Sequence, residues 1–299
     1  MNDIAISSQE LREKNRSALP ASARELGRYD FWYYTRLSTA DKILDSRSFW
    51  VSNLCDMNDL DELELHKRER EKLFALCFCN SNTEKIPMWY LYSGIAGTGA
   101  SLGLAPGAML AFLKSLTTVT GQTPDGGESR LAVGSDVELR FGWVFYRKQK
   151  EPGQILYRNK WYTIDDVNAF TDGNYFLKAY PWEYEKEFRL VFINKTKTTF
   201  KRLLVPIPVT LCETMKLRLA PELNAAGLKK VKGLKHIGKD AKPTLLFSEL
   251  RIKMNLFHRN HSSLPDYLRE EFSRRKPDVQ PEALCQLIRD AACCAEGKS

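Results

Sequence analysis

The sequence predicts an α+β fold whose core contains mixed or antiparallel strands arranged in two sheets, at about residues 28–205. Apolar segments of strand length, bounded by polar or Gly/Pro-containing turns, recur through this part of the chain. Short helix-like segments separate several of them. The composition of the 299 residues, 43% apolar and 27% charged, is that of a globular protein that can bury a core without disulfides or metals.

The predicted elements follow one another along the core. The first strand, residues 31–37, is rich in aromatic side chains, and the Ser-Thr pair that follows can cap a short helix. Residues 88–93 indicate a short helix or turn, and the Gly-rich residues 97–104 lead into a strand. Residues 159–180 have helical character between their ends. The other strands are expected at residues 48–54, 73–79, 137–147 and 182–193.

The segment at residues 182–193 has the clearest period-two pattern. Its even positions are mostly apolar, whereas its odd positions carry Glu183, Glu185, Glu187 and Arg189. One face is therefore expected to pack on the core and the other to be acidic. Carboxylates on one face repel one another, which favours a site that uses a cation or a proton transfer. A solvent-exposed edge strand screened by neighbouring bases explains the same pattern.

Aromatic residues precede a Gly-rich segment in the middle of the core. Trp89, Tyr90 and Tyr92 are followed by Gly97 and Gly99, which can place a ring platform beside backbone that a phosphate can approach. Ordinary core packing explains the aromatic residues equally well. The glycine spacing is not that of a dinucleotide-binding or P-loop motif.

The C-terminal part of the chain is strongly basic. The chain has 45 Lys+Arg against 37 Asp+Glu, a net charge of +8, and the excess is concentrated beyond residue 195. Such a cluster can follow a nucleic-acid phosphate backbone, or it can simply keep the surface solvated. The lysines concerned are Lys229, Lys230, Lys232 and Lys235.

Composition suggests three regions: an N-terminal helical extension (1–27), a core domain (28–205) and a basic C-terminal region (206–299). The last region ends in an amphipathic helix, which we expect to dock on this chain or on another subunit.

Seven cysteines without CxxC spacing, and an N-terminus without an apolar leader, favour a reducing, cytoplasmic location. The longest apolar stretch, residues 203–212, is interrupted by two prolines, so no membrane-spanning segment is expected. His258 and His261 lack an HExxH motif and nearby acidic ligands, so we expect no metal.

Several short motifs resemble a known bacterial family in their order and spacing. They are Tyr33-Tyr34-Thr35, Ile43-Leu44, Phe49-Trp50-Val51-Ser52, Asn58-Asp59 with Glu62, Cys77-Phe78, Met88-Trp89 with Tyr92 and Gly97, and finally Lys178, Trp182, Glu185, Glu187 and Arg189. Over about residues 29–195, the chain resembles the bacterial domain-of-unknown-function family 2971. That family is in turn similar to divergent ADP-ribosyltransferases, whose split, strongly bent β-sheets hold NAD as the substrate.

The resemblance implies roles for individual residues. Tyr33, Tyr92 and Glu187 match the first-strand, aromatic and late-strand positions that hold NAD. Glu187 would stabilise the oxocarbenium-like transition state, Tyr92 would stack on the nicotinamide, and Glu185 would orient or deprotonate the acceptor. A shared site requires Tyr33 and Glu187 to reach one ribose-nicotinamide unit. The NAD-binding set implied is Tyr33, Thr35, Arg36, Trp89 and Arg189, with either arginine on the pyrophosphate.

Two functions of different classes follow. The first is an NAD-consuming ADP-ribosyltransferase or NAD glycohydrolase that modifies a macromolecule, with a toxin or phage-defence setting implied by the resemblance alone. The second is a catalytically inactive module of the same fold that binds nucleic acid, a partner protein or an inhibitor. Tyr33 suggests the second, because many relatives have a histidine there. A metal-dependent nuclease is a weaker third hypothesis, because the acidic group Asp56, Asp59, Asp61 and Glu62 lacks a partnering lysine motif.

Overall fold

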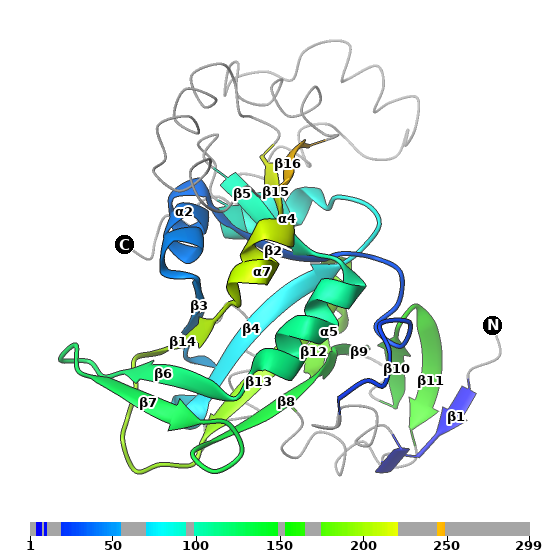
Figure 1. Cartoon of the computed structure of the whole chain (residues 1–299). Coiled ribbons are helices and arrows are strands. Elements are labelled where there is room, and N and C mark those ends of the chain that lie inside the picture. Colours follow the sequence, from blue (N-terminus) through cyan, green and yellow to red (C-terminus); the bar gives the residue numbers. More distant parts are fainter. Residues whose placement is uncertain are drawn as a thin grey trace, which may run out of the picture. The chain divides into compact units, whose positions relative to one another are not determined.

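The computed structural model describes residues 4–7, 9–10, 19–54, 70–93, 99–148, 153–164, 175–220 and 244–248 (Figure 1). These residues form helices and mostly antiparallel strands, in agreement with the predicted α+β class. They divide into two compact units, each assembled from segments distant in sequence. The first unit comprises Met1–Tyr33, Lys42–Asn82 and Gly103–Met215, and the second Tyr34–Asp41, Thr83–Leu102 and Lys216–Ser299. The division into regions predicted from composition stays a prediction.

The central sheet of the first unit is built around one strand that is buried on both faces. This strand, β13 (Glu187–Asn194), pairs antiparallel with β4 (Leu73–Asn80) on one side and with β8 (Val137–Trp143) on the other. Figure 1 shows the three strands side by side. The first residues of β2 (Phe31–Arg36) pair with the far edge of β4. Nearly every side chain of β13 is buried because both faces are covered: Val191 belongs to a buried cluster with residues of another sheet, and Phe188 on the other face packs against Phe31, with ring centroids 4.9 Å apart.

A second sheet diverges from the first at Val144. The chain passes from β8 through Val144 into β9 (Phe145–Arg147), and the Val144 N–H donates to the Glu187 carbonyl over 2.9 Å. β9 lies within a sheet of order β1-β11-β10-β9-β12. The remaining strands of that sheet are β1 (Ile4–Ile6), β10 (Gln154–Tyr157), β11 (Lys160–Ile164) and β12 (Leu177–Ala179). A buried apolar cluster that includes Phe145, Leu177 and Val191 joins residues of both sheets.

A third sheet of the first unit has the order β3-β14-β6-β7. One face is buried along β3 and β14, with Phe49 and Leu203 at 0% exposure, and Phe49 packs edge-on against Phe112 with ring centroids 5.6 Å apart. Phe112 belongs to the helix α5 (Pro106–Ser115). The strands are β3 (Ser48–Ser52), β14 (Arg202–Pro206), β6 (Thr118–Gln122) and β7 (Glu128–Ala132). The short helix α7 (Val209–Thr214) follows β14 in the chain.

In the second unit, β15 (Lys216–Leu219) pairs in parallel with β16 (Thr244–Phe247). The Ala220 N–H donates over 3.0 Å to the carbonyl of Gly99, which begins β5 (Gly99–Leu104). The predicted short helix is confirmed as α4 (Ile86–Ser93). Further helical elements among the described residues are α2 (Leu37–Ser46) and the 3-10 turns η2 (Arg70–Lys72) and η3 (Tyr180–Glu185).

Two local predictions are wrong, and a third is tested only in part. The segment at 159–180, expected to be helical between its ends, begins with β11 and ends with β12, and residues 165–174 lie outside the described residues. β11 follows a tight hairpin turn in which Arg158 and Asn159 both have positive φ. The strand expected from residue 182 begins only at Glu187, because η3 (Tyr180–Glu185) takes up the preceding residues, with Pro181 in its first turn and a left-handed Lys186 at its end. Residues 4–6, placed in a helical extension, form β1.

Candidate functional site

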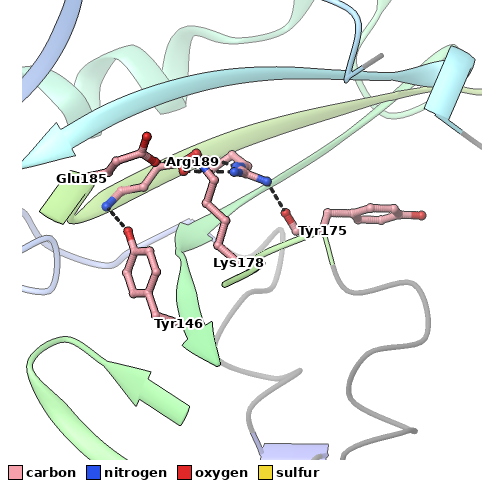
Figure 2. A network of polar contacts seen from close by, with 6 residues as sticks. Tyr146, Tyr175, Lys178, Glu185 and Arg189 are labelled. Carbon is pink, nitrogen blue, oxygen red and sulfur yellow. Dashed lines mark hydrogen bonds and ion pairs between the residues drawn. The ribbon is translucent and has the colours of Figure 1, made fainter. Parts of the chain in front are cut away.

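A network of buried ions lies where the first two sheets diverge (Figure 2). Lys178 comes from β12, Glu185 from η3, and Glu187 and Arg189 from β13. Their exposed fractions are 7%, 3%, 3% and 0%. Residues of two sheets and a 3-10 turn therefore converge on one buried polar cluster.

Both carboxylate oxygens of Glu187 are occupied. Oε1 accepts a hydrogen bond of 2.5 Å from Arg189 Nε, and Oε2 accepts one of 2.9 Å from Arg189 Nη2. Lys178 Nζ donates to the same Oε2 over 3.1 Å. The backbone N–H of Glu187 donates to the hydroxyl of Tyr146 over 2.8 Å. Glu187 is thus held by a bidentate guanidinium, an ammonium and a tyrosine.

The two cations also bind groups other than Glu187. Lys178 Nζ donates to Glu185 Oε2 over 2.5 Å and lies 5.1 Å from the ring centroid of Trp182. Arg189 Nη1 donates to the carbonyl of Tyr175 over 2.9 Å. Two cations and two carboxylates leave the cluster without net charge. Balanced pairing is the condition under which ions are tolerated in a protein interior.

The network fixes the protonation states of its members. Burial by itself raises the pKa of Glu187, but the charges of Arg189 and Lys178 outweigh it and hold the pKa well below its usual value. Burial, reinforced by the negative charge of Glu187, raises the pKa of the Cys77 thiol and of the Tyr146 hydroxyl well above their usual values. Glu187 is therefore ionised near neutral pH, whereas Cys77 and Tyr146 are neutral.

Tyr33 does not share a face with Glu187. Trp32 and Glu187 both pair with Cys79, so those two residues lie on the same face of the sheet. Tyr33 follows Trp32 and therefore lies on the opposite face. Its ring packs against Phe49 and Phe78, with centroids 5.3 and 6.1 Å away, and burial followed by the influence of Cys77 raises its pKa to about 12. The first-strand and late-strand residues of the predicted NAD site thus point to different sides.

Four of the predicted site residues belong to the second unit: Thr35, Arg36, Trp89 and Tyr92. Thr35 is buried, Arg36 is exposed and Tyr92 is partly buried. Trp89 is 1% exposed, and its indole N–H donates to Glu84 Oε2 over 2.9 Å. The Ser248 hydroxyl donates to the same oxygen over 2.5 Å. Trp89 is therefore a packed core residue, as the alternative interpretation of the aromatic segment held.

Sequence reasoning missed the cross-sheet partners. Lys178 and Trp182 appear among the family-like motifs, but their residue types alone do not show that they contact the two carboxylates. Tyr146 and Cys77 carry no sequence pattern that links them to Glu187, because those contacts arise only when the sheets assemble. The lysine cluster at 229–235, the acidic group at 56–62, His258, His261 and the terminal amphipathic helix lie outside the described residues.

Two further searches concern only the part of the chain that the structure describes. No three His, Cys, Asp or Glu side chains are grouped there in a way that could hold a metal ion. None of the helices in those ranges combines the length and apolar character needed to cross a membrane.

No protein-family model matches this chain, and a search of curated proteins finds no match.

Proposed function

We propose that this chain is an ADP-ribosyltransferase-like module that binds a macromolecular partner and does not consume NAD. The observation that carries the proposal is the state of Glu187, which is 3% exposed and has both carboxylate oxygens bonded to Arg189 and Lys178. The family resemblance supplies the fold expected for the module. Tyr33, which suggested an inactive member from sequence, faces the other side of the sheet from Glu187.

A catalytic carboxylate must contact the ribose as positive charge develops on it. To do so, Glu187 would have to leave the guanidinium and ammonium that hold it. Removing one partner from a buried ion pair costs about 3–5 kcal/mol, because the remaining charges are left uncompensated. Such a rearrangement would consume much of the binding energy that a substrate can supply. A structural role for Glu187 requires no rearrangement.

The second candidate function is the NAD-consuming transferase or glycohydrolase implied by the resemblance. One observation favours it: the neighbouring cations keep Glu187 ionised, and an ionised carboxylate is what stabilises an oxocarbenium-like transition state. The two functions differ in whether NAD ever reaches this carboxylate.

An assay with the purified full chain separates the two. The protein is incubated with NAD labelled on the adenylate and with a cell lysate, and nicotinamide release and label transfer are measured. We expect neither above the rate of a heat-inactivated sample. The comparison includes Glu187→Gln and, as a matched control, Glu183→Gln, which makes the same change at a partly exposed residue outside the network. Turnover by the parent and by Glu183→Gln, but not by folded Glu187→Gln, would establish the enzyme instead.

A further inference from the structure

We propose that the outer face of the second sheet binds single-stranded nucleic acid through an aromatic and basic shelf formed by Lys148, Trp161, Tyr180 and Trp182. The inference rests on the proposed function, in that it names the partner of the binding module. It uses only residues of the first unit. It is also independent of the lysine cluster at 229–235, which lies outside the described residues.

The shelf has two neighbouring rings that solvent can reach. The Trp161 ring on β11 and the Tyr180 ring at the start of η3 have centroids 5.3 Å apart and planes inclined by 44°. Tyr180 is 40% exposed, and Trp161 is partly exposed. Lys148 Nζ lies 4.6 Å from the Trp161 centroid and donates to Gln154 Oε1 over 2.8 Å. The lysine is therefore held over the face of the Trp161 ring, and the more exposed Tyr180 ring offers the stacking surface.

The shelf is attached to a rigid base. Trp161 and Trp182 pack against a small buried cluster made by Val144, Tyr146 and Leu156. Trp161 and Tyr146 lie on the same face of the sheet, because each pairs with Leu156 from a neighbouring strand. Trp182 also covers the Lys178 ammonium of the buried network. Trp182 thus contacts both the ion network and the cluster under the shelf. The network therefore has a structural role in a protein that does not catalyse a reaction.

The local charge suits a polyanion. Between residues 145 and 148 and between residues 153 and 164, every charged residue is basic. The two acids of η3 are compensated, Glu185 by Lys178 and Glu183 by Lys186. Of the basic residues in these two ranges, Lys148 lies on the face of Trp161 and Tyr146. Arg147 and Lys160 pair with Ile155 and Tyr157 and lie on the opposite face, and Arg158 packs on the Trp143 ring. A polyanion at the shelf therefore meets the Lys148 ammonium and no uncompensated carboxylate among the described residues of these strands and of η3.

The exposed rings favour nucleic acid over an acidic protein. An acidic peptide would use the cations but would gain little from the rings. Bases stack on aromatic side chains and phosphates bind the adjoining cations, so single strands use both features. A duplex keeps its bases stacked inside and offers them no access to Tyr180 or Trp161. The chemical class indicated is single-stranded DNA or RNA read without strong sequence preference.

The test measures the binding of fluorescein-labelled oligo-dT of twenty nucleotides to the full chain by anisotropy. An abasic strand of the same length keeps the phosphates and lacks the bases. Tyr180→Ala is expected to weaken binding of oligo-dT by about five-fold or more, the low end for one stacked base, and to leave binding of the abasic strand unchanged. Trp161→Phe keeps a ring and its packing on the buried cluster, so this variant should lose less affinity for oligo-dT than Tyr180→Ala does. Lys148→Gln should reduce the salt slope by about 0.7.

A matched control is Tyr29→Ala. Tyr29 also has a cation over its ring, the Arg28 guanidinium at 5.0 Å from the ring centroid, but Tyr29 lies outside the second sheet. This substitution should leave both affinities unchanged. Equal binding of oligo-dT by Tyr180→Ala and the parent would overturn the proposed shelf. So would polyglutamate displacing labelled oligo-dT as well as unlabelled oligo-dT does. The absence of any oligo-dT binding by the parent at 50 mM salt would also overturn it. NAD turnover is measured separately, so failure of the shelf and failure of the proposed function give different results.

Discussion

Removing the ammonium of Lys178 is the most direct perturbation of the buried network. In the Lys178→Met variant, Glu185 loses the lysine it contacts at 2.5 Å, and Glu187 keeps only Arg189. The cluster then carries two carboxylates and one cation at positions that are 3% exposed or less. Breaking a buried pair in this way costs about 3–5 kcal/mol. With a urea m-value of about 3 kcal/mol/M, the unfolding midpoint should fall by about 1–2 M.

The assay is urea unfolding followed by circular dichroism, with two comparison variants. Lys178→Met/Glu185→Met removes one charge of each sign and should recover most of the lost stability, because the remaining Glu187 and Arg189 are still paired. Lys186→Met removes a lysine from a partly exposed pair with Glu183 and should change the free energy of unfolding by no more than about 1 kcal/mol. A loss below 1 kcal/mol for Lys178→Met, or no recovery in the double variant, would refute the reasoning.

The difference in stability between the parent and Lys178→Met should change with pH in a direction that the ion network predicts. Because the pKa of Glu187 is depressed in the folded protein, its pairing stabilises the parent above its unfolded pKa of about 4.5, and this stabilisation is lost as the pH falls through the folded pKa. In Lys178→Met, protonation of Glu185 removes the carboxylate charge that has lost its lysine. The stability deficit of that variant relative to the parent should therefore shrink below about pH 5. A deficit that stays constant from pH 7 to pH 4 would argue against an electrostatic origin.

Two further predictions concern residues beside the network and in the third sheet. The raised pKa of the Cys77 thiol, caused by burial and by Glu187, should make its alkylation by iodoacetamide at pH 8 at least about tenfold slower than in the urea-unfolded chain, measured by peptide mass spectrometry. Equal rates would contradict a protected thiol. Gly121→Ala would place a methyl group 2.6 Å from the Phe200 ring and should lower the free energy of unfolding by about 1–3 kcal/mol. Gly107→Ala in α5 has open space around the new methyl group and should not lower the free energy of unfolding. Thermal unfolding of the two variants distinguishes these outcomes.

The sequence predicts strands well where one pattern dominates. Residues 31–37 and 73–79 are apolar and rich in aromatic or other large side chains, and both segments form strands close to their expected bounds. Period two alone was misleading at residues 182–193. Alternating Glu and apolar residues predicted one packed and one acidic face, interpreted either as a site that uses a cation or as a solvated edge strand. The strand is paired on both edges and buried on both faces, and Lys178 from another sheet binds Glu187. Pairing and packing between distant segments decide exposure, and a local pattern does not contain them.

Hairpin geometry limited the prediction at residues 159–164. Arg158 and Asn159 are not the Asn-Gly or Asp-Gly pairs that indicate a two-residue turn, yet both adopt positive φ. Asparagine tolerates this conformation, whereas arginine does so only where its surroundings compensate. Here the Arg158 guanidinium lies 4.1 Å from the Trp143 ring centroid, a contact that joins the turn to the end of β8. A tertiary contact of this kind cannot be read from the local sequence.

The candidate site shows why one motif supports two opposed functions. The five residues that carry the late part of the resemblance expected from sequence all meet in the structure: Lys178, Trp182, Glu185, Glu187 and Arg189. Cations that keep a glutamate ionised serve catalysis only if the carboxylate still has a free side toward the substrate. In this chain the same cations occupy both oxygens of Glu187 and are themselves bound to Glu185, Trp182 and the Tyr175 carbonyl. Ionisation and access are therefore separate requirements, and the sequence motif reports only the first.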